Sequence, residues 1–217
     1  MKKFELTNEF ITNMFGTKLF RIRALVEFGD VEAGELGGYV EKESNLGHDD
    51  NAWVYDNAWV YGNARVYGDA QVSGDALVYG NARVYGNAWV YGNALVCGNA
   101  LVYGNARVCG DALVCGNARV CSDALVCGNA RVCSDEDYAY AHGFGSVNRT
   151  TTFFRLKDGG VGVRCGCFYG TLAQFRDKIR ETHGETKKAQ EYLMLADLME
   201  LRFEEDENEV GNRKYVE

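Results

Sequence analysis

A six-residue pattern of apolar and polar positions fills the middle of the chain. From position 52 to position 132, Ala and Val recur two residues apart, and each Val except Val72, which precedes Ser73, is followed by Tyr or Cys and then, with few exceptions, by Gly and Asn or Asp. The pattern repeats fourteen times without an insertion. Because side chains alternate along a strand, Ala and Val share one face and the variable residue between them points the other way. Gly and Asn favour turns, so each hexad predicts one short strand and one corner, with Ala and Val in the core.

The repeat resembles a known family. Residues 66–71 read VYGDAQ, which is similar to the hexapeptide repeat of left-handed parallel β-helices, and the Val-Tyr-Gly-Asn-Ala form resembles uncharacterised repeat proteins of phages and prophages. The resemblance implies a mainly β, left-handed solenoid with three hexads per coil, whereas crossovers between parallel strands are usually right-handed. Residues 109–120 recur almost verbatim at 121–132, so a flatter, two-sided solenoid with a twelve-residue period stays open.

With eighteen residues per coil, the variable positions form three outward columns. The first column is largely apolar and contains Trp59, Leu77, Leu95, Leu113 and Arg131. The second is rich in arginine and contains Arg65, Arg83, Leu101 and Arg119, and the third contains Trp53, Gln71, Trp89, Arg107 and Leu125. A face with Trp59 and three stacked leucines is too apolar to be left in water. We expect this face to be either the subunit interface of a homo-oligomer, specifically a trimer, or a contact with the C-terminal part of the chain. We expect the arginine column to be solvated.

The flanking segments divide the chain into three parts. Residues 1–49 predict an N-terminal cap, with strands at 4–7 and 18–25 joined by a turn at Gly16 and with two imperfect hexads at 37–40 and 44–46. Residues 50–135 are the solenoid. Residues 136–217 predict an α+β module of order ββαα, which has a linker at 138–142, strands at 150–155 and 161–168, and helices at about 172–184 and 187–203. This module is short for an independent core, so we expect it to pack on the solenoid or on another subunit. The acidic stretch 204–209 is expected to be a solvated tail.

Composition limits the partners and the compartment. The net charge of −8 makes a nucleic-acid backbone an unfavourable partner. No apolar run approaches the roughly 20 residues that span a bilayer, and the first residues do not form a signal sequence, so we expect a cytoplasmic protein without membrane contact.

Six of the eight cysteines occupy the corner position that elsewhere holds Tyr, as single-base changes after duplication would explain. Cys97, Cys115 and Cys133 would stack about 4.8 Å apart, within disulfide range, but a reducing cytosol would keep them as thiols.

The sequence offers few catalytic candidates. The hexapeptide acyltransferases, which this fold resembles, place a catalytic His beside a cleft. Here His48 falls in a phase break before the first regular hexad, and we interpret it as a turn residue. Cys165 and Cys167 could join Cys133 and His142 in a zinc site, but their spacing matches no standard zinc motif. We therefore predict no catalytic residues, no metal site and no cofactor.

A loop after the solenoid is the candidate ligand site. Backbone amides, hydroxyls and guanidinium groups could cradle the phosphate of a small nucleotide-like ligand, although a plain loop leading into a strand explains the same residues. The candidate residues are His142, Gly143, Gly145, Ser146, Asn148, Arg149, Thr150, Thr151 and Arg164.

These observations favour a non-enzymatic binding protein. The resemblance to phage proteins implies a function that blocks or sequesters a component of the bacterial host, such as part of its antiviral defence. The target would be a host protein docking on the flat faces or a nucleotide held by the C-terminal module. A hexapeptide-class acyltransferase and a structural or virion spacer are the alternatives. A mimic of DNA is disfavoured because the aspartates of the repeat are too sparse to trace a phosphate ladder.

Overall fold

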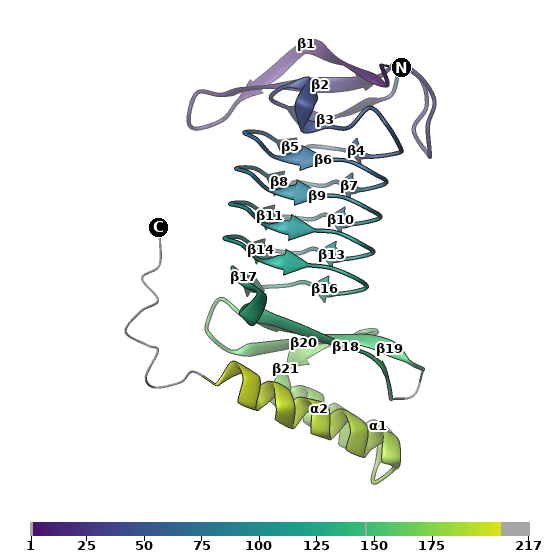
Figure 1. The fold of residues 1–217 in the computed structure, drawn as a ribbon, viewed down its shortest axis with the longest axis vertical. Coiled ribbons are helices and arrows are strands. Elements are labelled where there is room, and N and C mark those ends of the chain that lie inside the picture. Colours follow the sequence, from purple (N-terminus) through teal and green to yellow (C-terminus); the bar gives the residue numbers. More distant parts are fainter. Residues whose placement is uncertain (1, 146, 205–217) are drawn as a thin grey trace.

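Three parallel sheets run along a solenoid in the computed structural model, which describes residues 2–145 and 147–204 (Figure 1). Every hexad forms one two-residue strand followed by a corner, as the alternation predicts. The strands are β4 (Trp53–Val54), β5 (Trp59–Val60), β6 (Arg65–Val66), β7 (Gln71–Val72), β8 (Leu77–Val78), β9 (Arg83–Val84), β10 (Trp89–Val90), β11 (Leu95–Val96), β12 (Leu101–Val102), β13 (Arg107–Val108), β14 (Leu113–Val114), β15 (Arg119–Val120), β16 (Leu125–Val126) and β17 (Arg131–Val132).

Each strand pairs with the strand three hexads away. Leu95 lies beside Leu77 on one side and Leu113 on the other. The sheets therefore contain β5-β8-β11-β14-β17, β6-β9-β12-β15 and β4-β7-β10-β13-β16. This register confirms eighteen residues per coil and the three predicted columns. The two-sided solenoid with a twelve-residue period is wrong, because no strand of the repeat pairs with the strand two hexads away.

The repeat residues have separate structural roles. All alanines and valines of the hexads are fully buried and form one continuous core. The glycines turn the corners with positive φ, and at Gly86 (φ +69°) a Cβ would lie 3.0 Å from the backbone nitrogen of Gly104 in the next coil. Asparagines form ladders along the corners, where the Asn81 side chain donates to Asn99 at 3.0 Å. The corners therefore need glycine both for the backbone angle and for the close approach of successive coils.

An N-terminal hairpin closes one end of the solenoid. Strands β1 (Phe4–Thr12) and β2 (Lys18–Ala24) are antiparallel, and β3 (Leu36–Val40) pairs with β2 on one edge and in parallel with β5 on the other. A short 3-10 helix, η1 (Glu43–Asn45), follows. Leu46 then bridges to Val66, so both imperfect hexads belong to the first coil. Phe4 and Trp53 are fully buried beneath this cap.

The C-terminal module has two more strands than predicted. After η2 (Asp135–Asp137), an antiparallel sheet forms from β18 (Tyr138–Phe144), β19 (Arg149–Arg155), β20 (Val161–Cys165) and β21 (Phe168–Thr171). The predicted linker at 138–142 is wrong because this segment pairs with β19. The predicted strand at 161–168 is two strands separated by a turn at Gly166 (φ +59°).

Two helices complete the module, as predicted. They are α1 (Leu172–His183) and α2 (Lys187–Phe203). A capping box of Thr171 and Gln174 begins α1, and Gly184 ends it. The module is therefore ββββαα rather than ββαα. Within the described residues, no helix combines the length and the apolar character that crossing a membrane requires. The predicted acidic tail lies outside the described residues from position 205 onward.

Strand β19 joins the module to the last coil, so that its sheet lies between the solenoid and the two helices (Figure 1). Phe154 is part of the solenoid core, whereas Phe153 belongs to the core formed with α1 and α2. The Thr152 hydroxyl accepts a hydrogen bond from the Leu125 amide at 3.0 Å, and the Lys157 amide donates to the Asn129 carbonyl at 3.0 Å. The module thus packs on the solenoid of its own chain, which was one of the two predicted arrangements, and it covers the open edge of the last coil.

Candidate binding surfaces and corner cysteines

The apolar column forms a continuous strip on one flat sheet. Trp59, Leu77, Leu95 and Leu113 are register neighbours on β5, β8, β11 and β14, and each side chain is only partly buried within the chain. At successive strand spacings of about 4.8 Å, the strip is about 15 Å long. Tyr39 of β3 continues it at the N-terminal end, and Arg131 ends it at the other.

The second face is cationic. Arg65, Arg83 and Arg119 are exposed, as expected for solvated side chains. Arg65 and Arg83 are direct register partners, and with Lys42 and Ser44 they line a groove of about 370 Å³. This groove combines three positive charges in a chain of net negative charge.

The third face carries an exposed aromatic side chain between two grooves. The cap covers Trp53 completely, but Trp89 in the same column is 41% exposed. The Arg107 guanidinium lies over the Trp89 ring, 5.1 Å from its centroid. A groove of about 590 Å³ extends from Trp89 to the loop at Gly29. A second groove of about 290 Å³ contains Trp89, Arg107, Gln71, Ser73 and Tyr91. The sequence placed Trp89 in this outward column but did not indicate that it would flank two grooves.

The predicted phosphate cradle does not form a single open site. Thr151 is buried, and its hydroxyl donates to the Cys165 sulfur at 3.2 Å. The Gly145 amide donates to a carboxylate oxygen of Glu191 at 3.3 Å, so a negative group already occupies this donor. Thr150 and His142 bond each other through Oγ1 and Nδ1 at 2.9 Å.

The remaining loop residues point to different places. Gly143 and Asn148 are exposed and have positive φ angles. The Arg149 guanidinium covers the turn at Gly166, where a Cβ would overlap it. Arg164 lies on β20, beside the corner cysteines of the last coils. Ser146 lies outside the described residues.

His48 has a structural position. Its Nδ1 accepts a hydrogen bond from the Lys3 amide at 3.2 Å, and its ring stacks on Phe4 with 4.5 Å between centroids. The Lys3 ammonium group donates to the carbonyls of Asp50 and Ala52 at 3.1 and 2.8 Å. The segment containing His48 therefore binds the cap to the first coil, in agreement with the interpretation of His48 as a turn residue.

The candidate zinc site of Cys165 and Cys167 with Cys133 and His142 is not assembled. Cys165 ends β20 and lies near Thr151 and the Tyr192 hydroxyl, whereas Cys167 follows the Gly166 turn and is exposed. Across residues 2–145 and 147–204, no group of three or more His, Cys, Asp and Glu side chains is arranged to hold a metal ion.

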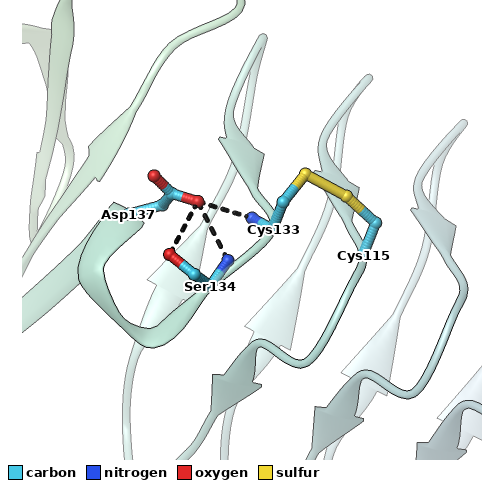
Figure 2. The surroundings of a disulfide bond; sticks show 4 residues. All are labelled: Cys115, Cys133, Ser134 and Asp137. Carbon is cyan, nitrogen blue, oxygen red and sulfur yellow. Dashed lines mark hydrogen bonds between the residues drawn. A yellow bond between two sulfur atoms is a disulfide. The ribbon is translucent and has the colours of Figure 1, made fainter. Parts of the chain in front are cut away.

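One pair of corner cysteines is a disulfide. Figure 2 shows Cys115 and Cys133 bonded across two adjacent coils. Their Cα atoms are 4.3 Å apart. The expected stacking is confirmed, but the expectation that these corner cysteines remain thiols is wrong for this pair. One carboxylate oxygen of Asp137 accepts from the amides of Cys133 and Ser134, each at 2.9 Å, as Figure 2 also shows. These bonds fix the chain where it leaves the solenoid.

A second pair of corner cysteines has an unusual electrostatic environment. The pKa of Cys109 is lowered to about 6, chiefly by a hydrogen bond from Cys127. A hydrogen bond from Tyr91 and the positive charges of Arg164 and Arg107 also lower this pKa, whereas burial raises it. The same hydrogen bond, together with burial, raises the pKa of Cys127. The arrangement favours a thiolate at Cys109 and a thiol at Cys127 at neutral pH.

Comparison with known proteins identifies only the repeat. A family model described as the YdcK beta solenoid repeat matches residues 58–74, 70–86, 76–92, 82–98 and 94–110. These segments lie in the central coils, so the chain is similar to β-solenoid repeat proteins in this region. No curated protein matches the chain.

Proposed function

We propose that this chain is a non-enzymatic binding protein that assembles through its apolar face into a homotrimer and binds a partner protein on the remaining faces. The strip of Trp59, Leu77, Leu95 and Leu113 is the observation that carries the proposal. It is in register on a flat, parallel sheet, and exposed apolar strips of this kind mark interaction surfaces. A rigid solenoid presents such a surface without the entropy cost of ordering a loop.

The target within this proposal is a protein of the bacterial host, such as a defence component, and the site of action is the host cytoplasm. The resemblance of the repeat sequence to repeat proteins of phages supports a target in the bacterial host. A protein target is favoured over a nucleotide because Thr151 is buried and the Gly145 amide already bonds Glu191.

The positions of His48 and His142 support binding rather than acyl transfer. His48 packs on Phe4 at the cap, and His142 bonds the Thr150 hydroxyl. Neither residue lines the grooves at Trp89 or at Arg65.

The oligomeric state tests the apolar face. Leu95→Arg places a charge in the centre of the strip and should convert the trimer into a monomer, as measured by native mass spectrometry and sedimentation velocity. Leu101→Arg is the matched control, because Leu101 has the same strand position and a similar partial burial but lies between Arg83 and Arg119 on the second face. It should leave the trimer intact.

Two outcomes would contradict the proposal. A wild-type chain that is monomeric at tens of micromolar would exclude the interface, and a trimeric Leu95→Arg variant would place the interface elsewhere. The same native mass spectra, taken on protein purified from bacterial cells, show whether a partner protein is retained. The Leu101→Arg and Arg83→Glu variants then test whether that partner uses the second face.

A further inference from the structure

Two pairs of corner cysteines have the same register. The Cys115 amide donates to the Val132 carbonyl at 2.8 Å, and the Cys109 amide donates to the Val126 carbonyl at 3.0 Å. In each case the next residue of the neighbouring coil is the partner cysteine. The first pair is a disulfide with 4.3 Å between Cα atoms. Cys109 and Cys127 therefore lie in register one coil apart, at a strand spacing of about 4.8 Å, which is within disulfide range.

Hydrogen bonds and positive charges surround Cys109. Tyr91 and Cys127 each share a hydrogen bond with its sulfur, and the positive charges of Arg107 on β13 and Arg164 on β20 act on it. The Arg164 Nε is buried without a hydrogen-bond partner. Two donors and two positive charges around one sulfur are the conditions that activate a nucleophilic cysteine.

Access to the pair is asymmetric. Cys127 is 7% exposed beneath the C-terminal module, whereas Cys109 is only partly buried. The groove of about 290 Å³ beside Trp89 ends at Tyr91 and Arg107, and Cys109 follows Arg107 by two positions. A small molecule in this groove would contact Tyr91, which shares a hydrogen bond with Cys109, and a carboxylate on it would meet Arg107.

We propose that Cys109 and Cys127 form a dithiol site that reacts with small, carboxylate-bearing disulfides and closes into a second intrachain disulfide. The Cys109 thiolate attacks one sulfur of the small disulfide, which forms a mixed disulfide and releases the other half as a thiolate. Cys127 then loses its proton and attacks the Cys109 sulfur, and the second half leaves as a thiolate. The protein dithiol is oxidised and the small disulfide is reduced to two thiols.

The first test compares alkylation rates within one molecule. Full-length protein is labelled with iodoacetamide across pH 5 to 9, and each cysteine is quantified by peptide mass spectrometry. At pH 7, Cys109 should react about tenfold faster than Cys167, although Cys167 is the more exposed of the two. The rate at Cys109 should reach half its plateau near pH 6. A Cys167 rate equal to or above the Cys109 rate at pH 7 would overturn the proposal.

The second test follows the exchange reaction with oxidised glutathione as the probe. Wild-type protein should gain a Cys109–Cys127 disulfide and release two equivalents of reduced glutathione. Cys127→Ser should stop at one glutathione bound to Cys109, and Cys109→Ser should acquire neither product at this corner. If glutathione stays bound to Cys109 in wild-type protein, or if the wild-type protein forms no Cys109–Cys127 disulfide, Cys127 does not resolve the mixed disulfide.

A third variant separates activation from folding. Tyr91→Phe removes one donor to Cys109 and should move the midpoint of the alkylation profile to higher pH. Tyr85→Phe is the matched control, because Tyr85 has the equivalent corner position in another column and stacks between Tyr67 and Tyr103. An unchanged midpoint in Tyr91→Phe, or an equal change in both variants, would refute the assigned role of Tyr91.

Discussion

The two adjacent phenylalanines of β19 allow the contact between module and solenoid to be tested from both sides. Phe154 and Phe153 are both fully buried, but consecutive strand residues face opposite ways, and they belong to different cores. Removing a buried phenylalanine side chain costs about 3–5 kcal/mol. A local loss of about 4 kcal/mol reduces the protection of the affected amides roughly a thousandfold.

Native-state hydrogen exchange resolves where each loss occurs. Phe154→Ala should lower the protection of β16, β17 and the Leu125 amide, which bonds Thr152. Phe153→Ala should instead lower the protection of α1 and α2, because Phe153 contacts Phe175 with 6.0 Å between ring centroids. In a solenoid each coil contacts only its neighbours, so the central coils should keep their protection in both variants.

Two patterns of exchange would refute this reasoning. A uniform loss along the whole chain in both variants would mean that solenoid and module unfold as one unit. Unchanged protection of β17 in Phe154→Ala would mean that the side chain does not close the end of the core. Each variant serves as the control for the other, since they differ by one position and remove the same side chain.

Five further substitutions test the corners and the cap by urea unfolding. Gly86→Ala should lower the free energy of unfolding by about 1–2 kcal/mol because of its positive φ. Ser122→Ala, already non-glycine at an equivalent corner, should cost only the exposed hydrogen bond between Ser122 and Tyr140, about 0.5 kcal/mol. Lys3→Met loses two buried hydrogen bonds and should cost about 1–3 kcal/mol. Burial lowers the Lys3 pKa to about 8, so above that pH the unfolded wild-type chain binds more protons than the folded chain. The stability of the wild-type protein relative to Lys3→Met should therefore rise from pH 7 to pH 10. Cys97→Tyr should be tolerated, whereas Cys127→Tyr should detach the module.

The solenoid was predictable because two strict rules act on the same residues. The period of six fixes the strands, and side-chain alternation fixes which residues are buried. The repeat alone does not distinguish a three-sided coil from a two-sided one, because the near-duplication of 109–120 at 121–132 fits a period of twelve equally well. Which of the two forms depends on which corners can stack on one another. Leu95 beside Leu77 and Leu113 is a long-range pairing that no local pattern specifies.

The errors in the module also have physical causes. Residues 138–141 alternate Tyr and Ala, but β18 is an edge strand with one paired neighbour, and its sequence lacks the β-branched residues that mark a buried strand. The sequence predicts an open phosphate cradle that includes Thr151, because hydroxyl groups can donate to a phosphate, but both Thr151 and its neighbour Thr152 are buried. They are buried because β19 lies between two cores, and the second core becomes visible only when the solenoid is in place.

The module also accounts for some of the corner cysteines. In one column the corner residues are Tyr67, Tyr85, Tyr103 and Cys121. The tyrosines stack about one coil apart, but Cys121 lies 3.7 Å from the Tyr138 hydroxyl of the module. In another column, Cys127 is buried where Tyr169 closes over Gly128.

A tyrosine at position 121 would need the space that Tyr138 occupies, and a tyrosine at position 127 would have to be buried beside the corner that Tyr169 covers. Small corner residues are thus a packing requirement in the last coil, and drift alone does not explain Cys121 and Cys127. Once packing selects a cysteine at position 127, any cysteine one coil earlier lies beside it, and Cys109 is that residue. The same substitutions that allow the module to close the solenoid therefore bring two sulfur atoms together.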